Sequence, residues 1–292
     1  MHFSTGRIFS CLIIPAFLAI QVCNAQQNSR QISYEKPISE NDSILLQKYL
    51  DSANNAGLFS IKYQLYMDSA LTIKPWKANW WQHKAMTLYK KKKYEAGAPY
   101  LDSAVKYNEL SYIDYSAFMK CIFQKSYRSA IADFNRAKVV IGAGEVMDHT
   151  YDFYIGLCYL QLNKLDSAEW YLKTTTAEQL KSRGEGYVHP LDLFYLGIVY
   201  YEMEDYARAN EAFGRCLKLY KNFSDAEYYN AICLKILKKN EEALAMILQG
   251  NADFKQGYTI NEDNVDYEVY PYQVTKPRVY EGTVKWLQEG AK

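Results

Sequence analysis

Histidines, and the clusters of charged residues that accompany them in catalytic or metal sites, are the first features to consider in this sequence. After residue 25 the histidines are His83, His149 and His189, and none forms a His-x-x-x-His pair or stands beside two cysteines. We interpret them as solvated or helix-end side chains. Neither a Walker-type phosphate loop nor a Gly-x-Ser-x-Gly elbow occurs. The sequence therefore predicts a protein that is no enzyme and uses no cofactor and no metal.

Two charged runs could bind ions or partners. The acidic run over residues 261–268 suggests calcium, but it lacks the glycine and the spaced glutamate of a calcium loop. We interpret it as a solvated turn. The basic run Lys90–Lys93 also has the character of a solvated turn, with binding of an acidic partner as the alternative.

Cysteines could form a disulfide or act as core residues. Cys121, Cys158, Cys216 and Cys233 each fall on the apolar face of an expected helix. Cys216 and Cys233 are the pair we consider for a bridge, because they lie on adjacent, antiparallel helices. Both are also ordinary core positions, so the prediction is free thiols.

The first 25 residues have the pattern of a secretory signal peptide. Arg7 precedes the apolar run Ile8–Ile20, and Ala25 precedes a polar start. The run is too short to span a membrane. This predicts cleavage after Ala25 and a periplasmic or secreted protein. The alternative is an outer-membrane lipoprotein with a lipid anchor at Cys23, although Val22 is a poor fit for the residue before a lipidated cysteine.

Composition and charge restrict the possible partners. The 292 residues are 49% apolar, enough to bury a core, and 28 of them are tyrosine. Tyrosine suits a thin protein in which many side chains are buried at one end and wet at the other. The net charge of +1 leaves no basic excess for nucleic acid.

The clearest structural pattern is a pair of amphipathic helices over residues 190–223. Leu193, Leu196, Gly197 and Tyr200 share one helical face, and the matching face of the second helix follows after Glu204-Asp205. That second face carries Tyr206, Ala209, Phe213 and Cys216. Such a hairpin cannot cover its own apolar surface, so it needs neighbours.

Leu196-Gly197-x-x-Tyr200 and Ala209-x-x-x-Phe213 resemble the tetratricopeptide repeat. The stretch departs from that pattern in having Cys216 for the last alanine and no closing proline. Similar units recur about every 34 residues, which yields six. The resemblance implies an all-α, right-handed superhelical solenoid. Together with the signal pattern and the polar composition of the next residues, it divides the chain into a signal peptide (1–25), a flexible leader (26–40), the solenoid (41–253) and a tail with a short terminal helix (254–292), which we expect to cap the last repeat.

The resemblance further implies scaffold or adaptor work, in which a segment of another protein binds the concave face built by the first helix of each unit. The middle of that face is too apolar to face water. A partner's apolar segment or the chain's own tail would cover it, and plain core packing in a tight superhelix is a further possibility. The expected partner-binding residues are Tyr89, Tyr112, Tyr115, Met119, Phe123, Phe153, Leu157, Phe194, Tyr201 and Tyr228.

Two tryptophans suggest an alternative to protein binding. Trp76 and Trp80 do not fit the structural aromatic position of the repeat, so they could stack on sugars in an envelope glycan-binding protein. Packing between the first two units is the competing interpretation.

The tail is rich in aromatic residues but has no helical period. We expect residues 258–287 to fold back on the last repeats, with Trp286 or a tyrosine touching Tyr228, Ile232 or Ile236. The open groove would then be confined to earlier units, and a partner would bind around Tyr112, Tyr115, Met119 and Phe153.

Overall fold

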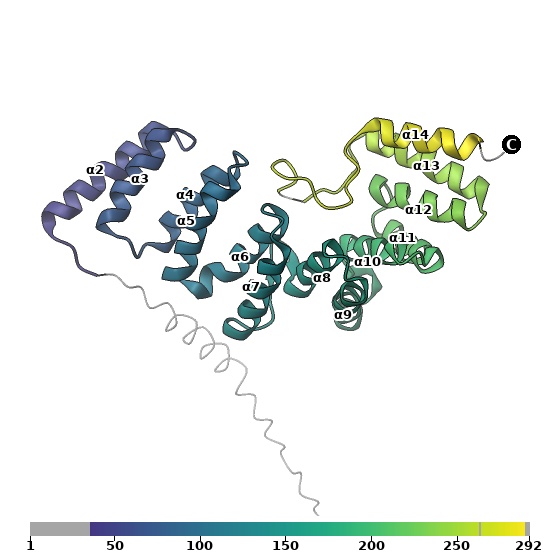
Figure 1. Ribbon diagram of the computed structural model, residues 1–292, viewed down its shortest axis with the longest axis horizontal. Coiled ribbons are helices and arrows are strands. Elements are labelled where there is room, and N and C mark those ends of the chain that lie inside the picture. Colours follow the sequence, from purple (N-terminus) through teal and green to yellow (C-terminus); the bar gives the residue numbers. More distant parts are fainter. Residues whose placement is uncertain (1–35, 263, 290–292) are drawn as a thin grey trace, which may run out of the picture.

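The computed structural model describes residues 36–262 and 264–289, and its helices form consecutive antiparallel pairs that together make an arc (Figure 1). Six pairs precede a last single helix, so the fold is the expected all-α repeat solenoid. The pairs are α2 (Glu40–Ala56) with α3 (Ile61–Ile73), α4 (Ala78–Tyr89) with α5 (Tyr94–Tyr107), α6 (Glu109–Ile122) with α7 (Tyr127–Val140), α8 (Tyr151–Gln161) with α9 (Leu165–Arg183), α10 (Pro190–Glu202) with α11 (Tyr206–Leu219), and α12 (Ser224–Ile236) with α13 (Asn240–Lys255).

The expected signal peptide, and with it the alternative of a lipid on Cys23, lies outside the described residues. Within the described part of the chain, no helix combines the length and apolarity that crossing a bilayer requires.

The turns inside the last five helix pairs share one backbone feature. A residue with positive φ stands two positions before the second helix and reverses the chain. None of the five is glycine, although the left-handed region is unfavourable for other residues by roughly 1–2 kcal/mol. The tertiary packing of each pair therefore holds its turn. The residues are Lys92, Lys125, Asn163, Glu204 and Lys238.

Close helix crossings depend on glycine. A Cβ built on Gly197 in α10 would lie 2.6 Å from Cε1 of Phe213 in α11, and one on Gly156 in α8 would lie 2.9 Å from Cγ of Leu172 in α9. Phe213 and Leu172 are both fully buried. The backbones approach closely at these two points because no side chain stands between them.

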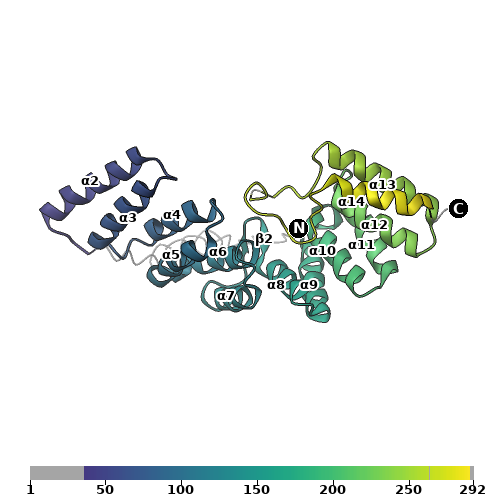
Figure 2. The same cartoon turned by 45° about the horizontal axis from the view of Figure 1, so that its top comes forward.

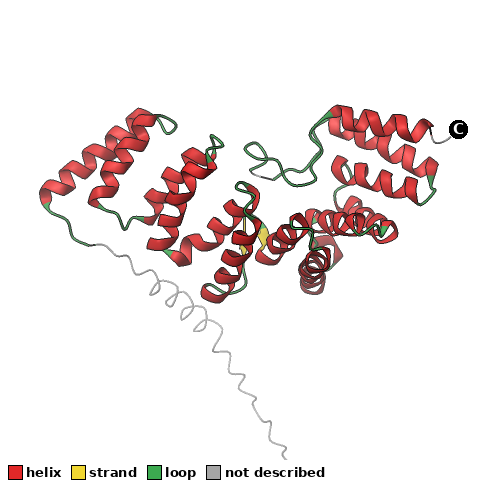
Figure 3. Cartoon of the chain, viewed as in Figure 1, coloured by secondary structure: helices red, strands yellow, loops and turns green. Residues whose placement is uncertain are grey.

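A small antiparallel strand pair interrupts the helices between α7 and α8 (Figure 3). β1 (Glu145–Val146) pairs with β2 (His149–Thr150), in the register Glu145↔Thr150 and Val146↔His149. The two turn residues between them have positive φ, as a tight hairpin requires. Thr150 then caps α8 by accepting a hydrogen bond from the Phe153 amide at 3.1 Å. The sequence did not predict this hairpin, which brings His149 to the inner side of the arc.

The last helix, α14 (Pro277–Glu289), covers the end of the solenoid against α13 (Figure 1). Tyr280 is fully buried, with its ring centroid 4.9 Å from that of Phe254 and 5.4 Å from that of Tyr228. The expected contact between a tail tyrosine and Tyr228 is thus confirmed. Trp286 stays about half exposed, with Lys235 Nζ 5.9 Å from its ring centroid.

All four cysteines of the described part of the chain are buried and unbridged. The closest pair is Cys121 and Cys158, with 3.4 Å between sulfurs, and not the pair Cys216 and Cys233 that the sequence suggested. Burial raises the pKa of the Cys233 thiol to about 12, which keeps it protonated and unreactive at neutral pH.

We predict that all four thiols are free in the native protein. Alkylation in denaturant without reductant, followed by peptide mapping, should find the alkyl group on each of the four cysteine-containing peptides. Protection of Cys121 together with Cys158 would instead reveal a disulfide between them.

Candidate functional site: the concave groove and the tail segment within it

The inner side of the arc is occupied by residues 256–276, which connect α13 to α14 and which we call the tail segment. In both Figures 1 and 2 it runs from the last repeat back across the inner side of the arc. Its contacts extend from Asp225 in α12 to Tyr94 in α5, so it spans from the sixth repeat to the second. The concave groove is therefore filled by the chain itself over most of its length.

Asp225 holds the base of the tail segment. Its Oδ2 accepts hydrogen bonds from Thr259 Oγ1 at 2.6 Å and from the Ile260 amide at 3.0 Å, and its Oδ1 accepts one from the Val274 amide at 2.6 Å. Asp225 is fully buried. One carboxylate therefore ties together the outgoing and the returning halves of the tail segment.

The middle of the tail segment is held through its own backbone. The Tyr195 hydroxyl donates to the Pro271 carbonyl at 2.9 Å. Tyr270 is 2% exposed, and its hydroxyl donates to Asn264 Oδ1 at 3.0 Å. This aromatic side chain joins the main hydrophobic core of the repeats, so the segment is packed into the groove and does not merely lie over it.

The tip of the segment carries the contacts that reach furthest along the arc. Tyr94 donates a hydrogen bond to Glu268. Lys125 Nζ donates to the Val269 carbonyl at 3.1 Å and lies 3.8 Å from Glu268 Oε1. Lys90 Nζ stands 4.9 Å from the ring centroid of Tyr267. Burial, and then Glu268, raise the pKa of Tyr94, so its phenol remains a donor.

Two interpretations from the sequence are corrected here. His149 is 2% exposed, not solvated, and the acidic run is not a solvated turn, because Glu262 and Glu268 both face the groove. His149 Nδ1 lies 3.3 Å from Asp192 Oδ1, and its Nε2 lies 3.3 Å from Glu262 Oε2. The hairpin before α8 and the tail segment bring these groups together, and neither has a pattern visible in the sequence.

The ionisation of His149 reflects two opposing influences. Burial lowers the pKa of its imidazole, but Asp192 and Glu262 outweigh burial and raise the pKa to about 9. Burial, and then His149, lower the pKa of His189. The rings of the two histidines meet edge to face with centroids 4.4 Å apart.

The residues expected to bind a partner fall into two groups, one buried and one partly exposed. Whether any of these residues binds a partner stays a prediction. Tyr89, Met119, Phe123, Phe153, Leu157 and Phe194 are at most 4% exposed and belong to the core. They offer no surface in this conformation. The partly exposed members are Tyr112, Tyr115, Tyr201 and Tyr228.

The two tryptophans of the glycan alternative are both partly buried. Trp80 packs against the small cluster of Ala53, Tyr63 and Met67 in the first repeat, as the competing interpretation expected. Trp76 has Lys36 Nζ 5.8 Å from its ring centroid. The glycan alternative stays a prediction for both residues.

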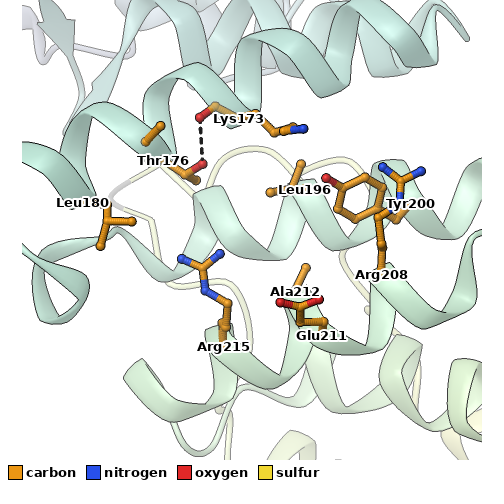
Figure 4. Close-up of a pocket in the computed structure, with 10 residues that line it drawn as sticks. Lys173, Thr176, Leu180, Leu196, Tyr200, Arg208, Glu211, Ala212 and Arg215 are labelled. Atoms are coloured by element: carbon orange, nitrogen blue, oxygen red, sulfur yellow. Dashed lines mark hydrogen bonds between the residues drawn. The ribbon is translucent and has the colours of Figure 1, made fainter.

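Apart from the concave groove, the structure has a hollow of about 230 Å³ that is lined by residues of α9, α10 and α11. Figure 4 shows Arg208 and Arg215 of α11 beside it. Arg208 Nε lies 2.7 Å from Asp205 Oδ2, and Arg215 Nε lies 2.8 Å from Glu185 Oε1. Because both guanidinium groups are already paired, this hollow is a poor anion site.

Glu227, two residues after Asp225 in α12, carries a marked pKa shift. Its side chain is buried, and its Oε2 has no hydrogen-bond partner among the described residues. Burial, and then Asp253, raise its pKa from 4.5 to about 8. The folded protein therefore binds this proton more tightly than the unfolded chain does.

We expect Glu227→Gln to stabilise the protein at alkaline pH. The raised pKa of Glu227 stabilises the wild-type fold, and this stabilisation is fully present below pH 4.5. It is lost as the pH rises towards 8, because the folded state must then hold a buried charge. Each pKa unit corresponds to about 1.4 kcal/mol, and after solvent screening we expect a gain of about 2 kcal/mol at pH 8. Melting curves at pH 5 and pH 8 measure it. The exposed Glu281→Gln is the control, and a gain independent of pH would contradict the assignment.

The comparisons with known proteins agree with this architecture. A family model described as tetratricopeptide repeat matches residues 190–223, the α10–α11 pair. This pair is a tetratricopeptide repeat (TPR), and the chain as a whole has the fold of a TPR solenoid. The other five helix pairs follow the same arrangement. Among curated proteins, no match to its sequence was found.

Several solved structures resemble this chain in fold. A tetratricopeptide repeat protein from Parabacteroides merdae aligns with a TM-score of 0.54 and 13% identity, over 86% of this chain and 100% of that one. PilW, titled a widely conserved type IV pilus biogenesis factor, aligns with a TM-score of 0.53 and 16% identity, over 75% of this chain and 96% of that one. BtubC from P. vanneervenii aligns with a TM-score of 0.53 and 14% identity, over 76% of this chain and 95% of that one. At such identities the likeness extends to the fold alone.

Proposed function

We propose that this TPR protein is a non-catalytic adaptor or scaffold of the cell envelope that binds an extended segment of another protein in its concave groove. The observation that carries the proposal is the tail segment itself. Lys125, Tyr195 and Asp225 hold it through backbone groups, at Val269, Pro271, Ile260 and Val274. Side chains that bind main-chain groups do not require one particular sequence, so the same groove can accept an extended segment from another chain.

In this proposal the partner binds beside the tip of the tail segment, on the inner side of the third repeat, where some side chains stay partly exposed. Tyr112 and Tyr115 are partly exposed there, next to core residues that the groove already buries. Partly buried tyrosines are good anchors because each offers a large apolar surface and a hydroxyl that can form a hydrogen bond.

Site-specific photo-crosslinking in the native host tests where the partner binds. A photo-reactive amino acid at Tyr112 should give a defined adduct, while the same amino acid at Val139, which is 78% exposed, is the matched control. With the identified partner purified, Tyr112→Ala should weaken binding at least tenfold and Val139→Ala should not. Equal crosslinking at both positions, or a partner insensitive to Tyr112→Ala, would contradict groove binding.

The envelope location has its own test. We expect the native protein from a periplasmic or secreted fraction to begin at Gln26, because the signal pattern ends at Ala25. Intact-mass analysis of the native protein measures this. An acylated N-terminal Cys23 would favour the lipoprotein alternative, and a native protein that retains residues 1–25 would contradict export by a cleaved signal.

A further inference from the structure

We propose that His149, His189 and Asp192 form a binding site for one divalent first-row transition-metal ion, beneath the tail segment. A ligand atom from each of these residues lies within 4.8 Å of the others. They come from β2, from the residue that caps α10, and from α10 itself, so the site joins the fourth repeat to the fifth. Two imidazoles and a carboxylate are ligands that zinc and its neighbours accept.

The spacing of His149 and Asp192 fits shared coordination. Their nearest atoms, Nδ1 and Oδ1, are 3.3 Å apart. Although His149 is 2% exposed and Asp192 fully buried, this Oδ1 has no hydrogen-bond partner among the described residues. Two ligands of a tetrahedral ion with bonds of about 2.0–2.1 Å are separated by roughly 3.3–3.4 Å. A metal ion between the two atoms would replace their long ion-pair contact by a direct bond to each.

The residues around His149, His189 and Asp192 make contacts of the kind that orient the ligands of bound metals. Gln179 Nε2 donates to the other oxygen of Asp192 at 2.7 Å, which leaves Oδ1 directed at His149. The same Gln179 accepts the His189 amide at 2.8 Å through its Oε1. Glu262 Oε2 faces His149 Nε2 at 3.3 Å. A metal-bound histidine usually donates its other ring N–H to a carboxylate in this way.

His189 provides the access and the adjustable ligand. It is only partly buried, and its Nδ1 accepts the Leu191 amide at 3.2 Å in the present structure. Coordination through Nδ1 replaces that hydrogen bond, while coordination through Nε2 turns the ring away from it. In either case the metal ion links the groove wall to the tail segment through Glu262.

Binding of Zn²⁺ and Co²⁺ to the chelator-treated full-length protein tests the proposal. We expect calorimetry to show one Zn²⁺ per chain with a Kd at or below the micromolar range, and Co²⁺ to give visible d–d absorption. Excess Zn²⁺ should also raise the melting temperature. His149→Ala and His189→Ala should each weaken binding at least a hundredfold, and Glu262→Gln about 10–100-fold. The exposed His83→Ala is the control and should bind as the wild type does.

Wild-type protein that binds no stoichiometric Zn²⁺ or Co²⁺ would overturn the proposal without reference to any variant. Binding that survives in both His149→Ala and His189→Ala, or that His83→Ala weakens equally, would assign the ion to another place. Because His149 is buried, its variant is first compared with the wild type by circular dichroism. If it does not fold, the partly exposed His189→Ala decides the result.

Discussion

Asp225→Ala is expected to lower the free energy of unfolding by about 3 kcal/mol and the melting temperature by roughly 10 °C. The substitution leaves the Ile260 and Val274 amides without their acceptor, and both lie in buried surroundings. Each unsatisfied buried donor is unfavourable by about 1–3 kcal/mol, and removal of the buried charge offsets part of the loss.

The matched control is Asp266→Ala, in the same tail segment but exposed, which should change stability by no more than about 0.5 kcal/mol. Hydrogen exchange should rise first in residues 258–276 of the Asp225→Ala protein. A variant that melts as the wild type does, with the tail segment still protected, would show that Asp225 is not its anchor.

Gly197→Leu should be at least as damaging. Even a Cβ at this position would lie 2.6–2.9 Å from three atoms of the fully buried Phe213 ring. Overpacking of a core typically destabilises by about 1–3 kcal/mol, and the closeness of this crossing places Gly197→Leu at or above the upper end. Gly214→Ala, in the partner helix with open space around its Cβ, is the control and should stabilise by about 0.5–1 kcal/mol.

The effect of Gly197→Leu should be local. Each repeat packs mainly on its neighbours, so hydrogen exchange should increase in the fourth to sixth repeats and much less in the first. Equal increases in α2 and α10 would show that the solenoid unfolds as a single unit.

The helix pairs could be predicted from the sequence because their determinants are local. The apolar spacing of Leu196, Gly197 and Tyr200 identifies a helix face whatever its neighbours are, and the small residue marks where a second helix crosses. The resemblance to the tetratricopeptide repeat then predicted the order of the helix pairs and the curvature of the solenoid. The contact between the terminal helix and Tyr228 could be predicted because the last apolar face of a solenoid needs a cover.

The sequence predicted that the tail folds back on the last repeats, but not that it runs on to the second repeat, because the determinants of that path lie far apart in the chain. Tyr94 and Glu268 are separated by 174 positions, and nothing about either residue alone indicates the other. The acidic run was interpreted as solvated for the same reason: a carboxylate that pairs with Lys125 or His149 has the same sequence signature as one in water. The burial of Phe153 and Phe194 also depends on the close approach of repeats, which periodicity does not measure.

The position of the tail segment after all six helix pairs has a consequence for the order in which the protein is made. A chain is synthesised from its N-terminus, and domains begin to fold as they emerge. Tyr94, Lys125, His149 and Tyr195 are all made well before the residues that contact them from positions 262–271. Every molecule therefore passes through a stage in which its inner surface is open, and this surface is closed only after residues 262–271 have been made.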